Sequence, residues 1–273
     1  MNRLSDTFRR LRKEKRKAFI PFVTGGDPDL KTTASLLLAL QKSGADAIEV
    51  GIPFSDPLAD GPVIQASSMR ALKRGTTPAQ VLKTIASVKN KLSVPVLCLS
   101  YWNPILQFQA ANGANVSGVS FLKAASKAGV SGLIIPDLPV EEATQFKQQA
   151  ERWGIATIFL AAPTSPPQRL RAIARTSEGF VYYVSLTGTT GIRQELSPEL
   201  RHGVRQLKLL TIKPVCVGFG ISTPKQAAAV CRVADGVIVG SALVRTIAEG
   251  PKQAAVKRAG AFARRIRNAI DGS

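Results

Sequence analysis

The chain has 273 residues, 45% of them hydrophobic, and 37 Lys and Arg against 18 Asp and Glu, which give a formal net charge of +19. This length suits one α/β barrel domain, and no apolar run approaches the ~20 residues of a membrane span. The single histidine excludes a multi-histidine metal site, and the spacing of the three cysteines predicts neither a metal site nor a disulfide framework. Because the charged N-terminus lacks a signal-peptide core, we expect a cytoplasmic protein.

The positive charge favours anionic ligands and is compatible with loose nucleic-acid contact. Its densest run, 9–17, lies in the predicted N-terminal helix, and no nucleic-acid-binding motif accompanies it. We therefore interpret the run as a solvated helix face and expect no nucleic-acid binding, with incidental RNA or DNA contact as the minor alternative.

The first half of the chain alternates short apolar runs with helical patterns. An amphipathic helix is predicted within 2–17, with Ser5 as its cap. A stretch of small and turn-forming residues, within 105–119, predicts a loop insertion after the third strand. Strands are predicted at 18–23, 47–50 and 94–100, helices at 30–43, 63–74 and 77–91, and a loop at 101–104.

The second half keeps the same alternation. Strands are predicted at 132–136, 155–160, 180–184, 215–217 and 236–239, and helices at 119–128, 140–153, 168–175, 198–209 and 224–232. About eight strand-then-helix units with continuous apolar strands predict an α/β fold, a single (β/α)8 TIM barrel over 1–273 with an extra N-terminal helix. The alternative is an open doubly wound sheet, but the chain lacks the Gly-x-Gly-x-x-Gly sequence that such a fold carries after its first strand.

Two carboxylates stand out near the end of the second predicted strand. Glu49 lies inside the apolar run 47–50, and Asp60 follows eleven residues later, just before Gly61 and Pro62. A buried charge is costly, and two carboxylates in different surroundings suit acid and base roles. The pattern alone also allows a salt bridge for Glu49 and a turn or cap for Asp60.

Glycine loops follow three of the later predicted strands. Thr190-Gly191, Phe219-Gly220 and Gly240-Ser241 each precede a helix, so their backbone N–H groups are available to hold a phosphate. No predicted strand has a lysine near its C-terminal end, which disfavours a Schiff-base aldolase and favours acid–base catalysis by carboxylates.

Four segments resemble the signature stretches of the α subunit of tryptophan synthase: 21–28, 48–65, 134–139 and 218–222. The resemblance runs from the N-terminal helix to Glu249. It implies a lyase that splits indole-3-glycerol phosphate into indole and glyceraldehyde 3-phosphate by a reverse aldol reaction. It also implies an α2β2 assembly, in which indole passes to a β subunit that carries pyridoxal phosphate, with no cofactor in this chain.

The resemblance also implies roles for individual residues. Glu49 matches the catalytic glutamate, Asp60 the aspartate that hydrogen-bonds the indole N–H, and Tyr182 the active-site tyrosine. Strand alternation sends either Tyr182 or Tyr183 inward. The other matching positions are Gly191, Gly220, Gly240 and Ser241 for the phosphate, Phe22, Leu99 and Phe219 for the indole pocket, and Asp56, Pro57 and Pro139 for the partner interface.

Some features depart from the family pattern. The predicted insertion lengthens a connection that faces the β subunit in the family, Thr189 stands where valine is usual, and the net charge contrasts with the family's mild acidity. Two other functions stay open beside the main one. The chain could be a stand-alone lyase that releases free indole, or a silent regulatory barrel, which would be favoured only if Glu49 or Asp60 were missing.

Overall fold

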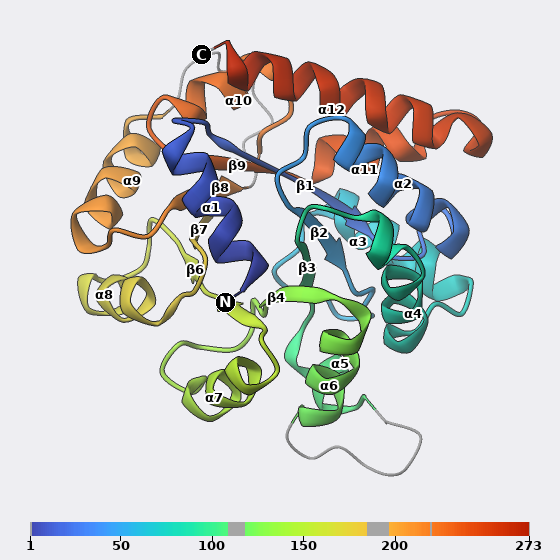
Figure 1. Cartoon of the computed structure of the whole chain (residues 1–273), viewed down its shortest axis with the longest axis horizontal. Coiled ribbons are helices and arrows are strands. Elements are labelled where there is room, and N and C mark those ends of the chain that lie inside the picture. The colour runs from blue at the N-terminus through green and yellow to red at the C-terminus, as the bar shows by residue number, and fades with distance from the viewer. Residues whose placement is uncertain (1, 109–117, 185–196, 219, 273) are drawn as a thin grey trace.

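A computed structural model of the chain describes residues 2–108, 118–184, 197–218 and 220–272 (Figure 1). Its strands form one parallel sheet in the order β5-β4-β3-β2-β1-β9-β8-β7-β6. Only Phe159 separates β5, which pairs with β4, from β6, which pairs with β7, so these two segments close the sheet into the predicted (β/α)8 barrel. The strands are β1 Ala18–Thr24, β2 Ile48–Gly51, β3 Val96–Leu99, β4 Val130–Ile134, β5 Ala156–Ile158, β6 Leu160–Ala161, β7 Val181–Val184, β8 Val215–Gly218 and β9 Gly236–Val239.

Helices surround this barrel (Figure 1). Several begin where the sequence supplies a cap: Thr77 and Thr223 each form a capping box with the glutamine three residues later, followed by proline at the first helical position. The helices are α1 Arg3–Lys13, α2 Leu30–Lys42, α3 Pro62–Lys73, α4 Pro78–Val88, α5 Trp102–Leu106, α6 Val119–Ala128, α7 Thr144–Arg152, α8 Pro167–Thr176, α9 Pro198–Leu210, α10 Pro224–Cys231, α11 Ser241–Ala248 and α12 Ala255–Asp271, with the 3-10 turns η1 Lys89–Lys91 and η2 Lys252–Ala254.

Alternation along each strand divides the core into two parts. In β1, Ile20 and Phe22 join a cluster that fills the barrel interior, whereas Phe19 and Val23 join the larger cluster between the sheet and the helices. The same alternation places Tyr182 inside and its neighbour in the outer cluster. A residue's parity along a strand therefore decides whether it reaches the interior of the barrel.

Helix α1 covers the N-terminal end of the barrel, where it crosses the ring of strands (Figure 1). Leu4, Phe8 and Leu11 are buried in the interior cluster, and the Phe8 ring lies 5.3 Å from that of Phe180. Asn2, not Ser5, caps this helix: its side chain accepts the Leu4 N–H and donates to the Ser131 and Gly154 carbonyls at 2.8 Å. The prediction of Ser5 as the cap was wrong because Asn2 starts the helix earlier.

Helix α12 was not predicted. It packs against α2, α10 and α11 and carries Arg267, which is only 5% exposed. The Arg267 guanidinium donates to the Lys17 carbonyl and to the Asp46 carboxylate, both at 3.0 Å, and to Asp271. The apolar face of this helix is interrupted by arginines, and only the folded chain shows that one of them is a buried anchor.

Several other boundaries differ from the predictions; β4, for example, runs over Val130–Ile134 and not 132–136. The segment 101–104, predicted as a loop, enters the short helix α5, and the helix predicted over 140–153 begins only at Thr144. Turns at 139–142 take the place of its first residues. The predicted insertion within 105–119 lies, apart from its ends, outside the described residues.

Candidate active site

Glu49 is a buried carboxyl at the C-terminal end of β2. Its neighbours Ile48 and Val50 face the outer cluster, so alternation turns Glu49 inward, level with Phe22 of β1. Its side chain is 1% exposed, and within the described part of the chain its Oε2 has no hydrogen-bond partner. Burial, followed by the charge of Asp60, raises the pKa of Glu49 to about 8.

Asp60 lies in the loop that connects β2 to α3. Its backbone N–H donates to the Pro57 carbonyl at 3.0 Å, which forms a turn that carries the side chain. Burial raises the pKa of Asp60 to about 6, opposed by a hydrogen bond from the Tyr101 side chain. At neutral pH the site therefore holds Glu49 mainly as the acid and Asp60 mainly as the carboxylate.

Tyr101 holds the Asp60 loop against the barrel. It follows β3, is buried, and its hydroxyl accepts the Ala59 N–H at 2.9 Å while bonding to the Asp60 carboxyl. The pKa of Tyr101 is raised by burial first and then by Asp60. Tyr101 was not among the predicted site residues, although its place directly after a barrel strand puts it at the end of the barrel where active sites lie.

Phe22 of β1 and Leu99 of β3 come from the strands on either side of Glu49, and Tyr182 comes from β7. Phe22, Leu99 and Tyr182 are all buried and belong to the interior cluster. The Phe22 ring lies over Gly51, where a Cβ would stand 2.6 Å from the ring edge, so a side chain at that position would displace the ring. Tyr182 has its pKa raised well above the ordinary value by burial and then by Glu49 and Asp60.

Two of the predicted phosphate positions lie at the start of α11. Gly240 is the N-cap of this helix and Ser241 is its first residue, so unpaired backbone N–H groups point out of the helix there. Gly220, beyond the neighbouring strand β8, has φ +79°, a conformation that favours glycine. Gly191 and Phe219 lie outside the described residues.

Gly240, a predicted phosphate-binding position, also lies close to the apolar side chain of Phe22. A Cβ built at Gly240 would be 3.7 Å from the Phe22 side chain. The helix N-terminus and the inward face of β1 are therefore adjacent, and one ligand can span them.

The predicted partner residues lie at the same end of the barrel as Glu49, in the connections that follow β2 and β4. Asp56 is exposed and its carboxylate accepts a hydrogen bond from Ser55, while Pro57 is half-buried. Between Pro57 and Asp60, Leu58 is 93% exposed. Pro139 is exposed beyond β4. The structure thus places Asp56 and Pro139 at the surface and Pro57 half-buried beside them, whereas Glu49 is buried in the barrel and Asp60 is half-buried in the loop.

Among the residues that the structure describes, no group of three or more His, Cys, Asp or Glu side chains is placed to hold a metal ion. No helix in that part of the chain is both long and apolar enough to span a membrane. Its three cysteines are buried thiols.

Comparison with known proteins points in one direction. The family model described as "Tryptophan synthase alpha chain" matches residues 8–271. The tryptophan synthase alpha chain of Geotalea daltonii is 49% identical over 246 residues, 90% of each chain. That of Prochlorococcus marinus strain MIT 9313 is 48% identical over 267 residues, 97% of this chain and 94% of the relative.

Solved structures agree with the sequence comparisons. The tryptophan synthase subunit alpha of Legionella pneumophila superposes with a TM-score of 0.90 at 38% identity and full coverage of both chains. A ligand-free tryptophan synthase structure from M. tuberculosis gives 0.86 at 34% identity, covering 99% of each chain.

Proposed function

This chain belongs to the tryptophan synthase alpha chain family, and from that premise we propose that Glu49 and Asp60 perform the family's reaction at the mouth of its barrel. The chain is a lyase of tryptophan biosynthesis, which cleaves indole-3-glycerol phosphate to indole and glyceraldehyde 3-phosphate. The residues that carry this cleavage are the subject of the proposal.

Glu49 acts first as an acid and then as a base. With a pKa raised to about 8, it holds a proton at neutral pH and donates it to C3 of the indole ring. The resulting carboxylate accepts the proton of the hydroxyl on the adjacent glycerol carbon. As that hydroxyl becomes a carbonyl, the carbon–carbon bond breaks, its electrons return to the ring, and indole and the aldehyde separate.

Asp60 stabilises the positive charge that the indole ring carries after protonation of C3 and before the carbon–carbon bond breaks. Protonation at C3 makes the indole nitrogen positive, and a carboxylate that accepts the N–H bond favours this state over the neutral ring. The pKa of about 6 keeps Asp60 mainly ionised at neutral pH. Tyr101, bonded to both Asp60 and the Ala59 N–H, acts as a positioning residue for this carboxylate.

The remaining site residues place the substrate. Phe22, Leu99 and Tyr182 form the walls for the indole ring. Gly220, Gly240 and Ser241 hold the phosphate through backbone N–H groups, supported by the N-terminus of α11. Phe219 and Gly191, to which the family resemblance gives the same two roles, lie outside the described residues. This arrangement needs no cofactor from this chain.

The observation that carries the proposal is the Glu49 carboxyl. Its Oε2 is buried without a hydrogen-bond partner among the described residues, which costs free energy that a purely structural residue would not incur. Glu49 could instead have been one half of a salt bridge. However, it forms no ion pair in that part of the chain. A buried, unpaired acid beside a second carboxyl is an arrangement suited to proton transfer.

We further propose that the chain works in the cytoplasm with a tryptophan synthase β subunit, in an α2β2 assembly in which the β subunit carries pyridoxal phosphate. The exposed segment around Asp56, Pro57 and Leu58 supports docking on the side of the barrel that holds the substrate. A partner there would press on the loop that carries Asp60 and favour its closed position.

The test is indole release from indole-3-glycerol phosphate by the purified chain, with and without a β subunit from the same source. The Glu49→Gln variant should lose activity by about 10²- to 10⁴-fold, while Glu249→Gln, which removes an exposed carboxylate, should not. Turnover by Glu49→Gln within a few-fold of the parent would reject the proposed role. Full activity without any complex would favour the stand-alone lyase.

A further inference from the structure

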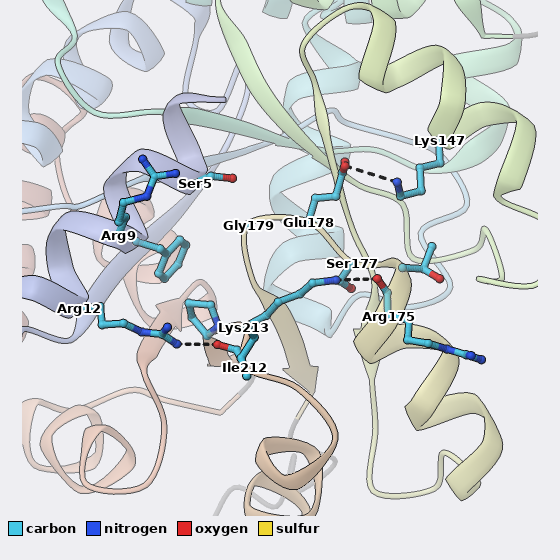
Figure 2. Close-up of a pocket in the computed structure, with 13 residues that line it drawn as sticks. Ser5, Arg9, Arg12, Lys147, Arg175, Ser177, Glu178, Gly179, Ile212 and Lys213 are labelled. Carbon is cyan, nitrogen blue, oxygen red and sulfur yellow. Dashed lines mark hydrogen bonds and ion pairs between the residues drawn. The ribbon is translucent and has the colours of Figure 1, made fainter. Parts of the chain in front are cut away.

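A cavity of about 520 Å³ lies beside α1, at the N-terminal end of the barrel, and Figure 2 shows the residues that line it. It opens between α1 and the connections that lead into β7 and β8. Ser5, Phe8, Arg9 and Arg12 of α1 line one side, and Lys147, residues 175–179 and residues 212–214 line the other. Its volume falls in the range of small-molecule sites, ~300–1,000 Å³.

Two of its cations are held by main-chain carbonyls. The Arg12 guanidinium donates to the Ile212 carbonyl at 2.5 Å, and the Lys213 ammonium donates to the carbonyls of Ala174 and Arg175 at 3.0 and 2.6 Å. The carbonyls orient both groups, and neither cation has a carboxylate within ion-pair distance among the described residues.

The carboxylate that lines the cavity, that of Glu178, already has hydrogen-bond and ion-pair partners within the chain. Glu178 accepts the Thr157 N–H at 3.0 Å. It also forms an ion pair with the Lys147 ammonium, at 3.4 Å, and Figure 2 marks this contact with a dashed line. Burial lowers the pKa of Lys213, the charge of Glu178 opposes this, and the charge of Lys147 adds a smaller lowering effect. The charged residues that line the cavity are nonetheless mostly cations, with Arg9, Arg12, Lys147, Arg175 and Lys213 against Glu178, so an anion there would meet a positive field.

Apolar surface adjoins these cations. The Phe8 ring lines the cavity from α1, and Ile212, between the two cation-bearing elements, is 86% exposed. An exposed isoleucine beside two cations without carboxylate partners offers a ligand both a charged contact and an apolar contact. The Ser5 hydroxyl faces across the same space (Figure 2).

We propose that this cavity binds a small organic dianion, a phosphate monoester or a dicarboxylate joined to an apolar or aromatic group, with its charges near Arg12 and Lys213 and its apolar part against Phe8 and Ile212. Such a ligand forms charge-assisted hydrogen bonds with both cations. It would bridge α1 to the segments before β7 and β8, so its binding would stabilise the folded chain.

The probes are phenyl phosphate and phthalate, measured by calorimetric titration of the full chain that carries Gly240→Asp. The added carboxylate at the start of α11 repels phosphate from the proposed substrate site, so binding that persists reports the second site. In this background Arg12→Gln and Lys213→Gln each remove one cavity cation. Lys13→Gln removes an exposed charge from α1 outside the cavity and is the matched control.

We expect one molecule of probe per chain, with affinity that falls as salt rises. Loss of a charge-assisted hydrogen bond should weaken binding by about tenfold or more for Arg12→Gln and for Lys213→Gln, with little change for Lys13→Gln. A crystal soaked with phenyl phosphate should show the anion between Arg12 and Lys213. Absence of binding at millimolar probe, an equal loss in Lys13→Gln, or density elsewhere would each overturn the proposal.

Discussion

Glu49→Gln should make the chain more stable as well as inactive. The folded-state pKa of Glu49 lies at about 8, against an ordinary value of 4.5. Between these two pH values the folded chain retains a proton that the unfolded chain has released. The Glu49 carboxyl therefore costs stability progressively as the pH rises from 4.5 to about 8, and the cost is constant above that.

The size of this cost follows from the shift. At ~1.4 kcal/mol for each pKa unit, raising the pKa from 4.5 to about 8 corresponds to about 5 kcal/mol. Glutamine does not ionise, so the variant avoids this term. Its amide is still buried at a position without a hydrogen-bond partner, which costs about 1–3 kcal/mol at every pH.

The pH dependence of the stability difference isolates the ionisation. Thermal melting of the parent and of Glu49→Gln should be compared near pH 5 and again above pH 8. Since ~1 kcal/mol shifts the melting temperature of a chain of this size by about 2–4 °C, the variant should gain about 10 °C relative to the parent on going from the low to the high pH. The matched control, Glu249→Gln, should show no such trend. A stability difference that is the same at both pH values would refute the reasoning, because Glu49 would then not be a buried neutral acid.

Three other predictions follow from the same site. Asp60→Asn should lower kcat with little change in KM, and it should move the alkaline limb of the pH–rate profile to lower pH, because the Asp60 charge contributes to the raised pKa of Glu49; steady-state kinetics from about pH 5 to 9 would check both, and a pure KM effect would contradict the role. Gly240→Asp should raise KM for indole-3-glycerol phosphate by tenfold or more and abolish competition by glycerol phosphate, whereas an unchanged KM would exclude the α11 N-terminus as the phosphate site. A β subunit from the same source should accelerate indole release by about 5- to 150-fold, the range of typical coupling energies, and sedimentation should show the complex; no complex and no rate change would contradict the partner proposal.

The sequence determined the barrel and the position of its carboxyl pair. Short apolar runs in alternation with helical patterns leave few other ways to bury a parallel sheet, and the period of two in β2 commits Glu49 to the face opposite Ile48 and Val50. The same period required one of the two adjacent tyrosines to face inward. These features are local, so they can be read along the chain.

Only the tertiary structure decided which of the locally possible side-chain orientations and contacts the chain adopts. It selected Tyr182 for the interior, and it brought the Tyr101 hydroxyl to the Asp60 loop across 42 residues of sequence. It also made Arg267 of α12 a buried anchor for Lys17 and Asp46, more than 220 residues away. Contacts between residues so far apart in the sequence depend on how the barrel closes, because the local sequence around one residue does not identify its partner. The raised pKa of Glu49 is of the same kind, since its main cause is burial, and burial exists only once the barrel has closed.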